Sequence, residues 1–319
     1  MKEEGVKLAR QRPSLNHIKV KRNISFSKYW SLYLIMVPGI IYFILFKYLP
    51  MWGVIIAFQD YSVFGGLLES TWVGLQHFNH MFHDREFYQV LWNTFIISFY
   101  KLLWGFPGPI VLAILLNEIR NMGYKRAIQT LAYLPHFLSW VIVGGILINI
   151  LSPSTGIVNE VIKFLGMNPI LFLADTSWFR SVLVASDIWK EIGWGAIIYL
   201  AALAGVDPQL YEAATVDGAN KWKQLWYVTI PALLPTIAIL FVLRLGNVLD
   251  VGFEQIFVLY NPVVYEVADV IETYVYRAGI EQAQFSYTTA VGLFKSVIAL
   301  LLVYLANKAA KKMGQEGIW

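Results

Sequence analysis

Residues 211–237 read "YEAATVDGANKWKQLWYVTIPALLPTI" and lie between two long apolar runs of the chain. The first half of this stretch is polar and rich in alanine, the middle carries two lysines, and the end is apolar with two prolines. Just upstream, Asp207 and Pro208 are typical of a helix start, because aspartate caps a helix and the fixed φ of proline suits its first position. The pattern predicts a polar helix from Pro208 to about Asp217.

A turn and a second helix are expected next. Gly218 favours a left-handed residue or a tight turn, which ends the first helix. The second helix is predicted from Ala219 to about Thr229, with its tryptophans on one side and its lysines on others. This distribution is typical of an interfacial helix, with rings toward lipid and ammonium groups toward headgroups. Pro231 and Pro235 are then expected to begin the next apolar segment.

The composition around this stretch is that of an integral membrane protein. Of the 319 residues, 57% are hydrophobic and only 14% charged, and the mean hydropathy is +0.55. A soluble domain carries about 25% charged residues. Twelve tryptophans and eighteen tyrosines fit the two lipid interfaces. Cysteine is absent, which excludes disulfides, thiolate nucleophiles and cysteine-ligated metals.

Six apolar segments are long enough to cross a bilayer. Helices are expected, because a lipid-exposed backbone must satisfy its own hydrogen bonds and the alternation of a membrane β-barrel is missing. The predicted fold class is therefore an all-α integral membrane protein with about six transmembrane helices. Pro38, Pro107 and Pro109 predict kinks or breaks. The six segments are 30–46, 91–116, 131–150, 180–203, 232–249 and 286–307.

The distribution of Lys and Arg sets the orientation. Sixteen lie in the two tails and in the loops on one side, and four in the alternate loops. Because basic residues gather on the cytoplasmic side, both termini and the 204–231 loop are predicted to be cytoplasmic, and the basic balance indicates no nucleic-acid partner. The expected domains are a cytosolic tail (1–29, not a signal peptide), a membrane domain (30–310) and a cytosolic C-terminal tail (311–319).

The polar helix leaves two interpretations open. Leu210, Ala213 and Ala214 share one face, with Glu212 beside them. The segment is either a solvated amphipathic connector or a docking surface, since small residues let a partner approach closely and a carboxylate fixes register with a basic group. Spacing alone does not separate the two.

A more specific pattern runs through the same stretch. A glutamate and two alanines, followed by a glycine and an apolar-x-apolar-Pro group, resemble the EAA loop of binding-protein-dependent ABC importer permeases. The tyrosine before them and the Asp-Gly-Ala after them are similar to the carbohydrate-uptake branch. Val228 and Ile230 replace the isoleucine and leucine usual there, a conservative departure. The residues that carry the resemblance are Tyr211, Glu212, Ala213, Ala214, Asp217, Gly218, Ala219 and 228–231.

Three further stretches agree. "GLQHFNHMF" (74–82) resembles the family's Gly-Leu-x-x-Phe outer segment, "WNTF" (92–95) its Asn-Thr span start, and "YLPHFLSWVIVG" (133–144) its third span. The likeness covers most of 30–310 and is strongest to oligosaccharide permeases. It implies the type I ABC importer permease fold, with the EAA helix as a coupling helix in a cleft of a separate ATPase.

The resemblance also implies partners. This chain would be one permease half in a bacterial cytoplasmic membrane, paired with a different second permease and served by an extracellular solute-binding protein. ATP and Mg would bind a partner ATPase dimer, since this chain has no phosphate-binding G-x-x-x-x-G-K-[ST] motif and is expected not to be an enzyme. The alternative is an ion-coupled secondary transporter with Asp187 and Glu191 as proton carriers. Such folds usually contain paired repeats, and none is evident.

Polar residues inside the predicted spans are candidates for the transport pathway, because charge in a membrane is costly and faces protein or water. Four share one face of the fourth span and two lie on the fifth. They would accept sugar hydroxyls, and Arg244 and Lys190 an anionic sugar. Alternatively, these charges pair and only hold the bundle together. The candidates, with one neighbouring tryptophan, are Asp187, Trp189, Lys190, Glu191, Trp194, Arg244 and Asn247; Lys101 and Lys295 carry less weight.

His77, His80 and His83 span about 120° of a helix, which is wide for one ion, so no metal site is predicted. The 250–285 segment is acidic and aromatic. It is expected to be an outer loop, either simply solvated or docking the solute-binding protein together with the 47–90 loop.

Overall fold

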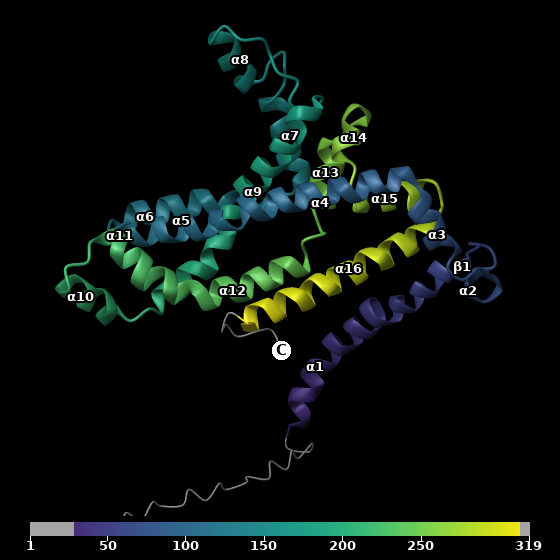
Figure 1. The fold of residues 1–319 in the computed structure, drawn as a ribbon, viewed down its shortest axis with the longest axis horizontal. Coiled ribbons are helices and arrows are strands. Elements are labelled where there is room, and N and C mark those ends of the chain that lie inside the picture. The colour runs from purple at the N-terminus through teal and green to yellow at the C-terminus, as the bar shows by residue number, and fades with distance from the viewer. Residues whose placement is uncertain (1–28, 313–319) are drawn as a thin grey trace, which may run out of the picture. The chain divides into compact units, whose positions relative to one another are not determined.

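The computed structural model describes residues 29–312, most of them in helices (Figure 1). Two two-residue strands, β1 (Gln59–Asp60) and β2 (Thr71–Trp72), pair antiparallel. The helices of the membrane domain after the first span are α2 (Gly66–Glu69), α3 (Gln76–His83), α4 (Arg85–Gly105), α5 (Pro107–Glu118), α6 (Met122–Tyr133), η4 (Leu134–Phe137), α7 (Trp140–Ile150), α8 (Ile157–Phe164), α9 (Thr176–Ala204), α10 (Pro208–Val216), α11 (Lys221–Gln224), η5 (Leu225–Thr229), α12 (Ile230–Gly246), α13 (Phe253–Leu259), η6 (Pro262–Val264), α14 (Tyr265–Ala268), α15 (Ile271–Tyr276), η7 (Arg277–Glu281) and α16 (Phe285–Lys312).

The chain divides into two units, one ending at Gly53 and one beginning at Val54. The first contains α1 (Trp30–Phe43), a π-helical stretch η2 (Ile44–Tyr48) and the start of the 3-10 helix η3 (Leu49–Phe58). With the rest of η3 they form a continuous apolar helix of 29 residues, 30–58, which is longer than the predicted 30–46 segment and has Pro38 inside α1. Apart from Tyr29, Lys311 and Lys312, the two predicted tails lie outside the described residues.

Four described helices are long and apolar enough to cross a membrane, and a bent pair would make a fifth. The pair, 122–137 and 140–150, turns by 104° after η4 and so breaks the predicted third span. α9 has 29 residues, about 43 Å at 1.5 Å per residue, but its centre is charged and it is not among the four. Six equivalent spans are thus too simple a description. The four are 30–58, 85–118, 221–246 and 285–309.

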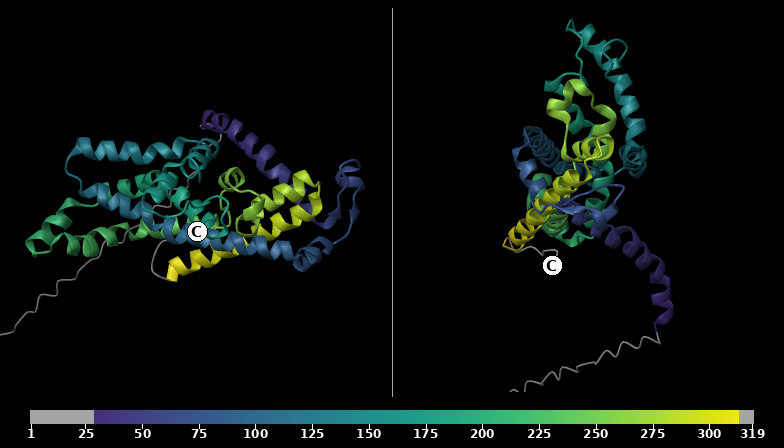
Figure 2. Two further views of the ribbon diagram at one scale, coloured as in Figure 1. Left: turned by 90° about the horizontal axis from the view of Figure 1, so that it is seen from above. Right: turned by 90° about the vertical axis from the view of Figure 1, so that its right-hand side faces the viewer.

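The breaks have local causes. α4 ends at Gly105 and α5 begins at Pro107, as the prolines predicted. The 104° bend was not predicted; Ser139 starts α7 there by accepting a hydrogen bond from the Ile142 N–H (3.3 Å). As a result α7 and α8 project away from the long helices (Figures 1 and 2).

α9 is the central helix of the second unit and packs against α4, α5, α6 and α12. Two glycines permit the close approach. A Cβ on Gly193 would lie 2.0 Å from the Ala132 carbonyl oxygen, and one on Gly195 would lie 2.8 Å from the Pro109 ring. Small residues at helix contacts are a common means of packing membrane helices tightly.

The 250–285 segment is not the solvated outer loop that was expected. It folds into α13, α14, α15 and two irregular turns, and much of it is buried. Ile256 and Val264 belong to one core with Ile97 of α4 and Phe179 of α9. Asp269 and Tyr274 are also buried, so they are not available for docking. The acidic residues of the segment suggest a solvated loop, but the apolar residues between them, such as Ile256 and Val264, form a core.

The predicted interfacial helix at 219–229 is also corrected. α11, η5 and α12 form one continuous helix from Lys221 to Gly246, which is itself an apolar span. The π-helical η5 precedes Pro231, which lacks an N–H and clashes with the carbonyl of the preceding turn, so a wider turn relieves the conflict. Pro231 and Pro235 therefore lie inside this span rather than at its start.

Candidate functional site

The polar helix α10 forms as the sequence predicted and has no buried residue. The Asp207 carboxylate caps it by accepting from the Gln209 N–H (2.9 Å), and Gly218 adopts the predicted left-handed conformation, with φ of +78°. Glu212 and Ala213 are exposed and Ala214 is partly exposed. The surface that carries the EAA pattern is therefore open to a partner.

Two side-chain contacts tie α10 to the span that follows it. The Tyr211 and Thr229 hydroxyl oxygens lie 3.1 Å apart. The buried Gln224 amide donates to the Thr215 hydroxyl (2.9 Å). Gln224 could not be predicted from its local pattern, because its contact with Thr215 depends on the turn at Gly218. These contacts connect α10 directly to the helix that begins at Lys221.

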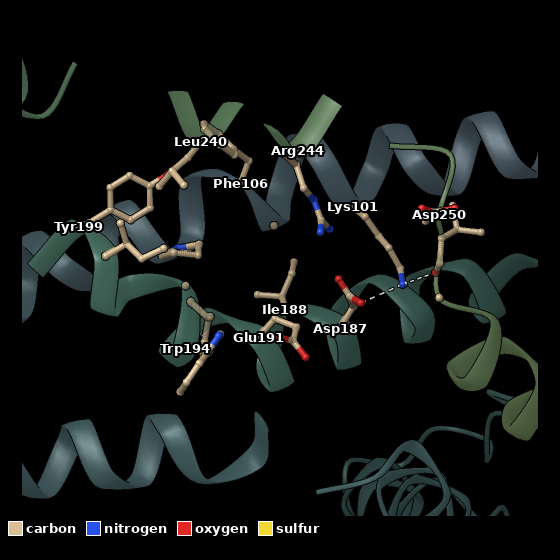
Figure 3. A pocket seen from close by; sticks show the side chains of 17 residues that line it. Lys101, Phe106, Asp187, Ile188, Glu191, Trp194, Tyr199, Leu240, Arg244 and Asp250 are labelled. Atoms are coloured by element: carbon tan, nitrogen blue, oxygen red, sulfur yellow. Dashed lines mark hydrogen bonds and ion pairs between the residues drawn. The ribbon is translucent and has the colours of Figure 1, made fainter. Parts of the chain in front are cut away.

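A cavity of about 380 Å³ lies on α9, between it and helices α4, α5 and α12 (Figure 3). Four of the predicted pathway residues line it: Asp187, Glu191, Trp194 and Arg244. Lys101 of α4, Tyr199 further along α9 and Asp250 of the turn before α13 complete its polar lining. The cavity thus combines both signs of charge with aromatic rings in one chamber.

On one side of this chamber, the Lys101 ammonium group donates hydrogen bonds to three acceptors. Lys101 is 4% exposed, and its Nζ donates to an Asp187 carboxylate oxygen (2.9 Å), to the Val251 carbonyl (2.8 Å) and to the Gln255 side chain. Because the three partners lie in α9, in the turn before α13 and in α13 itself, the ammonium joins these segments to α4. Lys101 is thus more important than predicted; its signal in the sequence was one cation in the second span and two carboxylates against one lysine at 187–191.

Arg244 differs from Lys101 in having no partner. Its guanidinium extends from α12 into the chamber between Phe106 and Lys101 (Figure 3). Within residues 29–312 it makes no hydrogen bond and no ion pair. A guanidinium carries a fixed charge and a planar set of donors that matches a carboxylate. Its position makes Arg244 the free cation of the chamber.

Three predicted pathway residues do not line the chamber. Lys190 is buried on another side of α9, where its Nζ donates to the His136 carbonyl (2.9 Å) and to Glu191 (3.2 Å). It therefore fits the structural interpretation, since it holds η4 at the 104° bend. Trp189 is half exposed elsewhere, and Asn247 borders only a small recess beside Arg244.

His136 links that bend to the chamber. Its Nδ1 lies 2.8 Å from the other Glu191 oxygen, and its ring stacks on Trp194 at 4.5 Å between centroids. Lys295, which received little weight, is paired with Asp250 and with Glu272 (3.1 Å). Lys101, Lys190 and Lys295 are therefore each paired with a carboxylate, which is the arrangement that the bundle-forming interpretation expects for them.

The three histidines of α3 contact different partners. His77 bonds to the Gln59 carbonyl (3.0 Å), His83 to the Asn79 carbonyl (2.8 Å), and His80 packs edge-on against Tyr287. In the described part of the chain, no three metal-ligating side chains come together.

Asp84, next to this segment, accepts hydrogen bonds from the Tyr274 and Tyr287 hydroxyls, both at 2.9 Å. Burial raises the pKa of Asp84, but the bonds from Tyr274, the Glu86 N–H and Tyr287 outweigh it and leave the pKa below its ordinary value. Burial and the same contacts raise the pKa of Tyr274. This cluster fastens α15 and α16 to the start of α4.

Comparison with known proteins supplies the family. Residues 105–315 match the model of the binding-protein-dependent transport system inner membrane component. A polygalacturonan/rhamnogalacturonan transport system permease of Bacillus subtilis, YteP, is 51% identical over 288 residues, 90% of each chain. Protein LplB of the same species is 49% identical over 90% of this chain and 91% of its own.

Two solved structures agree with these relatives. A chain of a bacterial ABC transporter for the import of the acidic polysaccharide alginate superposes with a TM-score of 0.84 at 44% identity, over 90% of this chain and 97% of its own. The alginate transporter in complex with an alginate pentasaccharide-bound periplasmic protein gives 0.85 at 43%, over 92% and 98%. This chain therefore belongs to the family of binding-protein-dependent transport system inner membrane components, the permeases of ABC importers, and has their type I fold.

Proposed function

We propose that this permease imports an oligosaccharide that bears carboxylates, such as a uronate oligomer. The observation that carries the proposal is Arg244, a cation with no partner in a chamber where the neighbouring lysine is neutralised. A carboxylate of the passing sugar would supply the missing partner, and Trp194 and Tyr199 offer ring surfaces beside it. The named activities of the relatives, on polygalacturonan and alginate, support the same class of substrate.

In this proposal, ATP hydrolysis and delivery of the sugar are carried out by other chains of the transporter. A second, different permease forms the opposite wall of the pathway, an ATPase dimer binds ATP and Mg, and an extracellular binding protein delivers the sugar. α10 is the ATPase contact, with Tyr211, Glu212, Ala213 and Ala214 on the helix and Asp217 and Gly218 at its end. Both termini and α10 are cytoplasmic in this arrangement.

The mechanism is alternating access. When ATP closes the ATPase pair, α10 moves with it, and the contacts of Tyr211 and Gln224 pass that movement to the helix from Lys221 to Gly246. Arg244 lies on that helix, about six turns from its start. The nucleotide cycle thereby changes the position of the guanidinium relative to α9, which alters its affinity for the sugar.

Proton coupling is a weaker fit to the same residues. Asp187 is held by Lys101, and Glu191 lies between Lys190 and His136, so both carboxylates have cationic or hydrogen-bonded partners. Neither stands free to exchange protons across the chamber.

The test is uptake into proteoliposomes that contain the full complex with its binding protein. Galacturonate oligomers are compared with the same oligomers after reduction of their carboxyl groups. We expect preference for the acidic series and its loss in Arg244→Gln, whereas Arg126→Gln, an exposed arginine of α6 outside the chamber, transports normally. Equal uptake of both series by the wild-type complex would refute an acidic substrate, and uptake that needs an ion gradient but no ATP would refute the importer.

A further inference from the structure

A second cavity, of about 540 Å³, lies between α4 and α9 and adjoins the first. Ile188 lines both, so the two form consecutive parts of one groove along α9. Thr176, the first residue of α9, lines the second cavity, which therefore lies toward the predicted outer end of that helix. Its ring, hydroxyl and cationic lining comes from Tyr100, Trp104, Thr176, Ser177, Arg180 and Ser181.

The α4 side of this groove is aromatic and open. Tyr100 and Trp104 are one helical turn apart and therefore share a face. They are 41% and 62% exposed, and within the described residues no other ring packs against Trp104. Amphipathic rings of this kind present a flat surface for the C–H face of a sugar, and the hydroxyls of Ser177 and Ser181 opposite them suit sugar hydroxyls.

The α9 side carries a cation that lacks a carboxylate. Arg180 donates from Nε to the Val267 carbonyl (3.1 Å) and from Nη2 to the Asn93 side-chain oxygen (2.7 Å). Both acceptors are neutral, and within residues 29–312 Arg180 forms no ion pair. Lys101, Lys190 and Lys295, by contrast, each contact an acidic side chain. A half-buried guanidinium with neutral partners retains its attraction for an anion.

The two unpaired arginines occupy successive cavities. Arg180 lies eight residues, or about 12 Å, from Ile188 toward the start of α9, and Arg244 lies in the chamber on the other side of that residue. A flexible chain with a carboxylate on successive sugars would meet the first cation and then the second. A neutral chain would gain only the rings and hydroxyls.

We propose that the groove lined by Tyr100, Trp104 and Arg180 is an outer glycan subsite, which receives a carboxylate-bearing sugar before that sugar reaches Arg244. The proposal rests on the import function proposed above. It assigns to Arg180 the first charge contact in the membrane, and to the two rings a contact that does not depend on sugar charge.

The experiment uses the reconstituted complex and galacturonate pentamers, with their carboxyl-reduced counterparts as the neutral probe. Arg180→Gln is expected to raise the half-saturating concentration for the acidic pentamer about tenfold and to leave that of the neutral one nearly unchanged. Trp104→Ala is expected to raise both by a similar factor. Trp92→Ala is the matched control, because Trp92 is an exposed tryptophan of α4 outside both cavities and should have no effect.

Three results would overturn the subsite. One is an equal loss of both probes in Arg180→Gln, which would mark a purely structural role through Val267 and Asn93. Another is loss of the second permease from purified Trp104→Ala complexes, which would mean that the groove seats that permease. The third is unchanged uptake in both variants. The wild-type complex is measured with both pentamers in the same experiment. If it shows no preference for the acidic pentamer, the proposed substrate class fails, and that result is distinct from failure of the subsite.

Discussion

The α10 segment and the chamber beside α9 are built in opposite ways. The first is exposed, continuous in sequence and held by few contacts: a cap, a left-handed glycine and two hydrogen-bonded pairs. The second is assembled from five stretches of chain around buried charges. A surface that fits another protein can be formed by one continuous run of residues. A part that must surround a substrate depends on how distant helices pack.

This contrast predicts that the chamber is energetically the more fragile of the two. Lys101→Met leaves Asp187 without its cation inside the bundle, which costs about 3–5 kcal/mol. We expect a large loss of folded protein and of thermal stability. The double variant Lys101→Met/Asp187→Leu removes both charges and should recover much of the folded yield. A double variant no more stable than the single one would contradict the buried pair as the cause.

At α10 the expected damage is to transport rather than to folding. Gly218→Val places a β-branched residue at φ of +78°, a strain of about 1–3 kcal/mol that is relieved by reshaping the turn. We expect a roughly tenfold fall in uptake with normal membrane insertion and a normal amount of protein. Gly218→Asn is the control, since asparagine tolerates the left-handed region. Normal ATP-driven uptake by the valine variant would remove α10 from the coupling role.

Loss of the hydrogen bond between Gln224 and Thr215, which connects α10 to the following span, is expected to have a smaller effect on uptake. Gln224→Leu and Thr215→Val each break one side of the 2.9 Å hydrogen bond, and a net contribution of about 1 kcal/mol is expected. A double-mutant cycle on uptake should show that the two changes are not additive. If the double variant loses the sum of the two single losses, the bond does not carry the movement of α10.

The smallest effect is expected at Asp84, far from both regions. Because its pKa is depressed in the folded state, it contributes stability that is present above its ordinary pKa and is lost as pH falls through the lower folded value. Tyr274→Phe removes one donor to this carboxylate, so the variant should be less stable than wild type at pH 7 and closer to it below about pH 4. The measurement is the unfolding temperature of both proteins across that range, and a difference that does not change with pH would argue against the carboxylate.

The two regions also differ in how well the sequence predicted them. The Asp207 cap, the helix from Pro208 and the left-handed Gly218 are local, so propensity and capping rules were sufficient. The continuation of the helix that begins at Lys221 through η5 into α12 was not predicted, because two prolines normally mark a helix boundary and here the π-turn accommodates them. In the chamber, the spacing on α9 predicted that Asp187 and Glu191 share one face of the helix. It did not identify Lys101 as the partner of Asp187.

Pairing across helices is the information that one sequence lacks. Lys190 and Asp187 have similar local patterns, yet one is buried against His136 and the other faces the chamber. The folded 250–285 segment shows the same limit, since its contacts with α7, α9 and α4 are made over long sequence separations.

The π-helical η5 has a consequence for the geometry of substrate contact. A π-turn contains one residue more than an α-turn would, so everything after it is rotated by about 100° about the helix axis. η5 precedes Arg244 on the same helix. Tightening this turn into regular α-helix would rotate the guanidinium out of the chamber while leaving the α12 backbone in place. The rotational phase of the span, and with it the side that faces the chamber, is thus set by the five residues of η5.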